Sequence, residues 1–410
     1  MARIDGFQRG MDNIHQDNEL GSDTARRIVN MDITDSGKLR MRKGRQRVLE
    51  LGGAHSMWDD NAGNAYLVHD NKIKKFNADG TLTIIGTFNA GANRASFLAL
   101  NGDIYVSCAT ASAIIRNGAL IPWGVEVPAS APALSLTTGQ LTAGAYHLAM
   151  TYVMADGRES GASLLSSITL NSVGGIATTA LPVPDSADVA KKRLYMSTPN
   201  GEVPYLAKEL SPLDQFTTIM TMPVGVELRT AYQSPPPFAI GLTYSNGCIF
   251  MIDAADPTVV WRTNALDYDH VDRRKNYYKF GTEVTVIAGT KGGGLYVCAD
   301  QTRFIGQAGT MSPVLTEVFE FGGIANTARI IPRTNEYIWM SERGPVIGHE
   351  AGAAEILAEN ALAPGLMINA ASMVREQDGI RQFVVVGNNS EGSILQAGSY
   401  AEAEITRRAR

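Results

Sequence analysis

The chain has 410 residues, of which 44% are hydrophobic and 19% are charged, so it can bury a sizeable core and is not generally disordered. Its formal net charge of −5 argues against a protein that grips nucleic acid over a broad basic face. No apolar signal core opens the chain, and no run approaches the ~20 apolar residues of a membrane helix. We therefore expect a protein made and folded in a cytoplasm, with no membrane insertion.

Residues 1–48 form an N-terminal arm that is more polar than the rest of the chain. A loop or a short helix is expected over residues 24–30, followed by two edge strands around the turn at Asp35-Ser36-Gly37. Cations alternate with apolar residues on the second strand and continue past it; they are Lys38, Arg40, Arg42, Lys43, Arg45 and Arg47. This basic segment is the candidate subunit interface. Two interpretations stay open: charges that guard an edge strand against aggregation, or a contact with acidic partner subunits or phosphates.

One unit recurs after the arm: a turn, a strand with an aromatic residue, a second turn, and a strand that ends near glycine. The aromatic anchors are Tyr66, Tyr105, Phe250, Tyr296, Trp339 and Phe383. Consecutive anchors are 39, 145, 46, 43 and 44 residues apart, and four of these spacings match a propeller blade of ~40–50 residues. The pattern predicts an all-β, β-propeller-like fold of about six blades, although sandwiches and barrels also space strands in this way.

The one long spacing exceeds a blade by roughly a hundred residues, which indicates an inserted domain. Proline-rich stretches, VPASAPA and SPPP, mark its ends. We therefore expect an arm at 1–48, about two blades at 49–126, an inserted module at 127–234 and about four blades at 235–410. Within the module, the order of a GAY strand, a DGRES turn and an RLYMS strand resembles fibronectin type III domains. The resemblance implies an inserted β-sandwich, fibronectin III- or Ig-like, of a kind that usually presents a surface and rarely does chemistry.

No pattern in the chain points to catalysis or to a cofactor. The acidic run at 266–274 could ligate a divalent cation through Asp267, Asp269, His270 and Asp272. It lacks the glycine and the terminal glutamate of a calcium loop, so pairing with the cations at 273–275 is preferred. The histidines show no zinc spacing, and no GxSxG elbow is present. We expect no enzyme, no metal and no other cofactor.

The three cysteines, Cys108, Cys248 and Cys298, are an odd number without a CxxC pair. Each lies in an apolar, strand-like run. This setting predicts buried free thiols that take no part in activity.

The arm resembles the opening of virion proteins from tailed bacteriophages. GFQRGMDNIHQDNEL comes first, with Asp12-Asn13 where the family has a pair of asparagines. A second run then keeps the pattern NxDxxxxGxLxxRxG at Asn30, Asp32, Gly37, Leu39, Arg42 and Gly44. A propeller interrupted by a fibronectin-like module is, in addition, similar to the tail nozzle proteins of short-tailed bacteriophages.

The resemblance implies a structural virion protein of the phage tail, made in the host cytoplasm. Such nozzles are homohexameric rings that continue the DNA channel, retain the genome and let it pass on ejection. The partners implied are further copies of the chain, adaptor and portal-side ring proteins, and tail fibres or spikes. Passing double-stranded DNA would be touched transiently and without specificity, and mild acidity would suit a lumen that repels phosphates.

The alternative is a receptor- or carbohydrate-binding virion propeller module. In it, tryptophans would stack on sugar rings; the candidates are Trp58, Trp123, Trp261 and Trp339. A propeller glycoside hydrolase is the third reading, and it would need paired carboxylates at a channel mouth.

Overall fold

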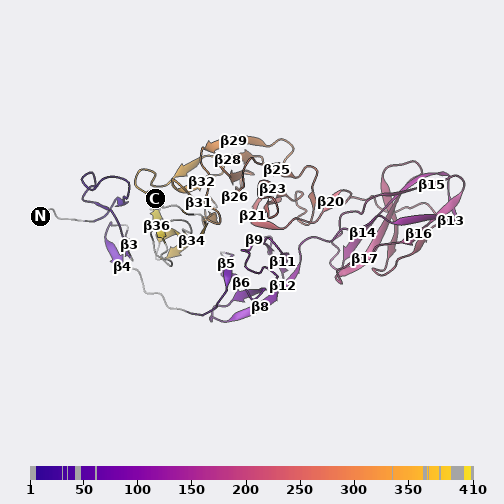
Figure 1. The fold of residues 1–410 in the computed structure, drawn as a ribbon, viewed down its shortest axis with the longest axis horizontal. Helices are drawn as coiled ribbons and strands as arrows, with labels where there is room; N and C mark the ends of the chain where they lie inside the picture. Colours follow the sequence, from indigo (N-terminus) through magenta and orange to yellow (C-terminus); the bar gives the residue numbers. More distant parts are fainter. Residues whose placement is uncertain are drawn as a thin grey trace.

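The computed structural model describes residues 6–29, 31–34, 36–41, 48–60, 62–334, 336–362, 367, 369–377, 380–388 and 401–407. Regular structure in these residues is β-strand, and six sheets are arranged as blades around a common centre (Figure 1). The fold is therefore all-β and propeller-like, as the sequence predicts. The described residues contain no helix long and apolar enough to cross a membrane.

Each blade is an antiparallel sheet whose neighbouring strands follow one another along the sheet in chain order. Blade 1 comprises β5 (His55–Asp59), β6 (Ala65–His69), β7 (Lys72–Phe76) and β8 (Leu82–Thr87). Blade 2 comprises β9 (Ser96–Leu100), β10 (Asp103–Ser107), β11 (Ser112–Arg116) and β12 (Ala119–Pro122). Blade 3 comprises β21 (Ala239–Ser245), β22 (Cys248–Asp253), β23 (Val259–Arg262) and β25 (Tyr277–Lys279).

The other three blades follow without a further insertion. Blade 4 comprises β26 (Val286–Gly289), β27 (Leu295–Cys298), β28 (Thr302–Gly306) and β29 (Val314–Phe319). Blade 5 comprises β30 (Arg329–Ile330), β31 (Tyr337–Ser341), β32 (Gly344–Gly348) and β33 (Ala354–Ile356). Blade 6 comprises β34 (Asn369–Gln377), β35 (Ile380–Asn388) and β36 (Ala401–Arg407). The described part of blade 6 thus has three strands where the others have four.

Asn-Gly pairs form several of the hairpin turns. Asn101-Gly102, Asn117-Gly118 and Asn246-Gly247 each have positive φ at both residues. Two consecutive left-handed residues make the tight turn whose twist matches that of the flanking strands, and asparagine and glycine adopt it most easily. These pairs therefore set the register of the strands that they join.

The six aromatic anchors all lie on the second strand of a blade and are all buried. The first four pack toward the next blade; for example, Tyr105 of blade 2 shares a core cluster with Met251 of blade 3. Trp339 and Phe383 instead pack toward the preceding blade. Trp339 therefore meets Tyr296 of blade 4 across one interface, with ring centroids 5.3 Å apart. The spacing of the anchors predicted the strands correctly, but not which face each ring would take.

Apolar cores join consecutive blades. Residues that alternate along the second strand of each blade contribute to the core on one side and to the core on the other side in turn. Ile104 and Val106 face blade 1, whereas Tyr105 between them faces blade 3. The same alternation gives five clusters, one at each interface from blades 1 and 2 to blades 5 and 6. Among the described residues no such cluster joins blade 6 to blade 1.

Residues between blades 2 and 3 form two further sheets at one side of the ring (Figure 1). One contains β13 (Ala133–Leu141), β16 (Gly174–Ala180) and β19 (Thr217–Ile219). The other contains β15 (Ser166–Leu170), β14 (Gly144–Met154), β17 (Val189–Ser197) and β18 (Pro204–Leu210). One apolar core contains residues of both sheets, among them Tyr146, Leu194 and Ile176. The likeness of this module to fibronectin type III domains stays a prediction.

The module returns to the propeller through β20 (Gln233–Ser234), which pairs with β24 (Val271–Asp272). In the arm, β1 (Gly10–Met11) pairs in parallel with β2 (Thr24–Ala25), and β3 (Met31–Ile33) pairs with β4 (Leu39–Met41). The prediction of a loop or short helix over residues 24–30 is therefore wrong for Thr24 and Ala25, which form the strand β2. Backbone bonds to residues 9–12 replace the bonds that a helical turn would make there.

The three cysteines are free and buried, as the sequence predicts. Burial raises the pKa of Cys298 to about 12 and also raises that of Cys248. Because the thiolate is the reactive form, we expect a thiol reagent to label the native protein slowly at pH 8 and completely in denaturant. Rapid labelling of all three native thiols would contradict the packing described here.

Trp339 is completely buried between blades 4 and 5. We expect Trp339→Ala to lower the free energy of unfolding by about 3–5 kcal/mol in a denaturant titration, because it leaves a large cavity. Met57→Ala is the matched control, since Met57 is 65% exposed, and should change it by less than about 0.5 kcal/mol. Equal losses in the two variants would contradict the assignment of the core.

Candidate functional site

Two of the six cations proposed as an interface lie on the described hairpin of the arm. Lys38 is exposed beside the turn, and Arg40 lies on β4 in register with Asp32 of β3. The other four, Arg42, Lys43, Arg45 and Arg47, lie outside the described residues. Within the described part, β3 and β4 pair only with each other, so the hairpin adds no strand to a blade.

The hairpin also exposes apolar side chains, which the pattern of charges in the sequence did not indicate. Met41 is 71% exposed, and Met31, directly opposite it, is 39% exposed. Leu39 and Val29 are exposed as well. The hairpin therefore exposes apolar side chains as well as cationic ones.

The arm touches its own propeller through a backbone bond from Asn13 to the carbonyl of Ala361, at 2.9 Å. Its charge is opposite to that of the rest of the chain. Residues 1–48 carry ten Lys and Arg against seven Asp and Glu, whereas the remaining residues carry 26 against 34. The arm and the rest of the chain therefore carry net charges of opposite sign, which attract each other at long range.

A second charged centre holds the inserted module on the propeller. Arg158, in the DGRES turn of the module, donates to the Pro122 carbonyl at 2.8 Å and to Asp269 Oδ1 at 3.1 Å. Its Nε also binds Asp156 at 2.7 Å, and Asp156 lies 3.6 Å from Arg116 of blade 2. The Arg158 side chain is only 11% exposed, so these bonds are largely shielded from water.

His270 of the propeller completes this junction. Its Nε2 lies 2.7 Å from the carbonyl of Glu159, and its Nδ1 lies 2.8 Å from Asp267. The Glu159 carboxylate binds Arg193 and Tyr195 of β17, both at 2.6 Å. One turn of the module is therefore bonded at once to the propeller and to its own sheet, which fixes the orientation of the module.

The acidic run at 266–274 is thus a loop of the propeller that binds the inserted module through Asp269 and His270. Asp272 pairs with Arg274 at 2.8 Å and with Lys275 at 3.7 Å, which are two of the three cations that the sequence suggested as partners. The bond to Arg274 lowers the pKa of Asp272 to about 2. Asp269 and His270 have partners 111 residues away, which the sequence did not reveal. In the described part of the chain no cluster of His, Cys, Asp or Glu is arranged to hold a metal ion.

The module carries an exposed segment with several apolar side chains. It runs from residue 213 to 226, and its exposed side chains are Leu213, Phe216, Met220, Val224 and Val226. Part of it lines an open groove of about 560 Å³ beside β18, an edge strand. The groove is lined by polar as well as apolar residues, among them Lys208, Glu209 and Thr221.

The four tryptophans have different surroundings. Trp123 and Trp339 are buried, and Trp123 donates to the Tyr268 carbonyl. Trp58 is half-buried and stacks on Phe97 at 5.5 Å. Trp261 is half-buried, and its Nε1 donates to Asp253 at 2.7 Å. Two of the four rings are therefore unavailable for stacking on a sugar.

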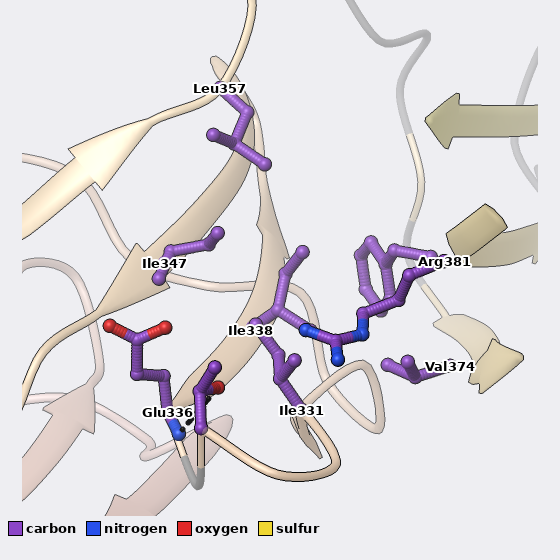
Figure 2. Close-up of a pocket in the computed structure, with 9 residues that line it drawn as sticks. Ile331, Glu336, Ile338, Ile347, Leu357, Val374 and Arg381 are labelled. Atoms are coloured by element: carbon purple, nitrogen blue, oxygen red, sulfur yellow. Dashed lines mark hydrogen bonds between the residues drawn. The ribbon is translucent and has the colours of Figure 1, made fainter. Parts of the chain in front are cut away.

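A small apolar cavity of about 50 Å³ lies between blades 5 and 6 (Figure 2). Ile338 and Ile347 line it from blade 5, and Val374 and Arg381 line it from blade 6. Pockets that hold small molecules usually exceed about 300 Å³. The cavity is therefore a packing gap between two blades rather than a site for a substrate.

No protein-family model matches the chain, and no curated protein does. Solved propellers are similar to it in fold alone. The WD40 domain of Pan2 from Neurospora crassa is 12% identical, with a TM-score of 0.34, and the match covers 81% of this chain and 85% of that one. Hsv2 from Kluyveromyces lactis is 8% identical, with a TM-score of 0.28, over 88% of this chain and 96% of that one. Scores this low carry no argument about function.

The junction is expected to respond to pH through His270. Burial lowers the pKa of His270, but the hydrogen bond and charge of Asp267 outweigh it, and the pKa is raised. The charged ring thus stabilises the fold below its unfolded pKa of about 6.5, and this contribution is lost as the pH rises through the raised value. Unfolding free energies between pH 5.5 and 8.5 should show this decline, and His270→Gln should remove it.

His147→Gln is the control for that experiment, because the His147 ring bonds to a hydroxyl, that of Ser167, and to no carboxylate in the described chain. It should leave the decline in place. A His270→Gln protein with the full pH dependence would show that another group is responsible.

Proposed function

We propose that this protein is a structural component of a bacteriophage tail. In this proposal several copies form a ring, or nozzle, that continues the DNA channel, retains the genome and lets it pass on ejection. Six copies are expected, as in the family that the arm resembles. The ring would contact adaptor and portal-side proteins on one side, and tail fibres or spikes around it.

The observation that carries the proposal is the arm. Its sequence follows the virion pattern, and its described hairpin belongs to no blade and exposes Met31, Leu39 and Met41. A hairpin that shows both apolar and cationic side chains is suited to bind an acidic neighbour. Rings of identical subunits commonly use such extensions, because each copy then offers one arm and receives another.

The module supports the same proposal. It is tied to the propeller through Arg158 and His270, and it exposes the apolar segment at 213–226. A surface held in one orientation by partly buried bonds can meet a neighbour without a further loss of conformational freedom. Such rigidity suits a part of a permanent ring better than it suits a flexible receptor-binding domain.

The charge of the body agrees with a DNA channel. A ring built from bodies with 34 acidic and 26 basic residues each would repel the phosphate backbone on average. Many basic contacts would instead bind DNA through counterion release and slow its passage. DNA would then touch the ring transiently and without sequence preference.

The mass of the purified protein in solution tests the proposal, alone and mixed with adaptor-ring protein. We expect a hexamer, or hexamers that form on the adaptor ring. A monomer or trimer that binds bacterial cells would instead support the receptor-binding alternative. In that case Trp58 and Trp261 are the rings to replace first.

Arm variants give a sharper test. We expect a chain that begins at residue 48 to fold but not to assemble. Met31→Ser with Met41→Ser, and separately Lys38→Glu with Arg40→Glu, should weaken assembly at least tenfold by analytical ultracentrifugation. The effect of the charge variant should be larger at low salt, since charges more than ~10 Å apart are screened at 0.1 M ionic strength.

Arg273→Glu is the matched control, because Arg273 is an exposed cation of the propeller, distant in sequence from the arm. It should assemble normally. Rings that form equally well without the arm would contradict the role assigned to it, whereas a truncated chain that no longer folds would show that the arm serves its own subunit.

A further inference from the structure

Two arginines from different blades reach the same strand of blade 6. Arg94, just before β9 of blade 2, donates from Nη1 to the Ala370 carbonyl of β34 at 3.0 Å. Arg329, the first residue of β30 in blade 5, donates from Nε to the Ser372 carbonyl of β34 at 2.9 Å. Carbonyls two residues apart point to the same edge of a strand and are about 7 Å apart. The two guanidinium groups therefore lie along one edge of β34.

Neither of these guanidinium groups forms an ion pair with a carboxylate of the described chain, although both side chains are half-buried. Burial and the positive charge of Arg94 lower the pKa of Arg329 to about 10, and Asp59 of blade 1 offsets this only in part. Burial also lowers the pKa of Arg94. Two partly desolvated like charges are thus hydrogen-bonded to backbone carbonyls and only partly compensated by the charge of Asp59, at a cost in free energy.

Both groups keep hydrogen-bond donors that no described residue uses. A guanidinium group has five N–H donors. Arg94 uses Nη1, while Arg329 uses Nε and, toward the Ala328 carbonyl at 2.6 Å, Nη1. The Nη2 groups of both arginines and the Nε group of Arg94 therefore donate to no described residue. Arginine with free donors in a partly dehydrated place is suited to bind phosphate or a similar anion.

We propose that Arg94 and Arg329 bind a phosphate-type oxyanion at the first strand of blade 6. The anion lies between the two guanidinium groups, accepts their remaining N–H donors and offsets their repulsion. A tetrahedral oxyanion suits two guanidinium groups better than a carboxylate does, because its oxygens point in several directions and can accept from donors on two sides. The anion thereby joins blades 2 and 5 to β34, next to the one interface where the described residues hold no apolar core.

Inorganic phosphate tests the site in the full-length protein. Thermal unfolding is followed in phosphate and in chloride at equal ionic strength, and binding is measured by calorimetry. We expect Tm to rise with phosphate concentration until the site is saturated, because the anion binds the folded state. Arg94→Gln and Arg329→Gln each keep an amide donor for the β34 carbonyl, and each should raise the Kd for phosphate at least tenfold.

Arg116→Gln is the matched control, since that guanidinium is already paired with Asp103 of the same blade at 2.7 Å. It should bind phosphate as the wild type does. If the two arginines serve only to hold β34, Arg94→Gln and Arg329→Gln will lower Tm in both anions but keep its dependence on phosphate, which would overturn the proposal. A wild-type Tm that is equal in phosphate and chloride would overturn it as well.

Short double-stranded DNA distinguishes the two sources of such an anion. A site for a free anion binds phosphate to the same extent with and without DNA. A site for a nucleic-acid backbone loses phosphate as DNA is added, and Arg94→Gln then weakens DNA binding too.

Discussion

The fold depends on one requirement: the second strand of a blade is apolar on both faces, and both faces must be covered. On the second strand of blade 2, Tyr105 needs cover from one side while Ile104 and Val106 need it from the other. A single four-stranded sheet cannot bury both faces, so a blade of this kind depends on the sheets that pack against it. The ring arrangement supplies a neighbour on each side, and the Asn-Gly hairpins keep the strands in the register that this burial requires.

The interface between blades 6 and 1 is different, since the described residues there share no apolar core. Hydrogen bonds from two arginines hold the first strand of blade 6 instead. Arg94 of blade 2 and Arg329 of blade 5 both donate to carbonyls of β34. Apolar cores are not weakened by charge screening, whereas contacts that use charge respond to ionic strength and to bound anions. The ring therefore combines five interfaces with apolar cores and one region, at β34, whose charged contacts depend on ionic strength.

The inserted module shows how polar bonds serve orientation rather than bulk stability. Arg158, Asp269 and His270 are few, but they are shielded from water and link two units that have separate cores. Partly buried ion pairs of this kind contribute little net stability, yet they permit one geometry only. Together with the exposed segment at 213–226 and the arm hairpin, they give the proposed ring a rigid body with two exposed apolar surfaces.

The local pattern of the sequence determined the strands, the positions of the six aromatic anchors and the burial of the three cysteines, because these depend on alternation and on turn residues close in the chain. It did not show that Trp339 and Phe383 pack backward, since a strand buried on both faces has no preferred side until its neighbours are placed. Nor did it pair Asp269 with Arg158, or bring Arg94 and Arg329 to β34. Contacts between residues far apart in the chain, from 43 to 276 positions here, follow no short spacing in the sequence, so only the tertiary structure decided them.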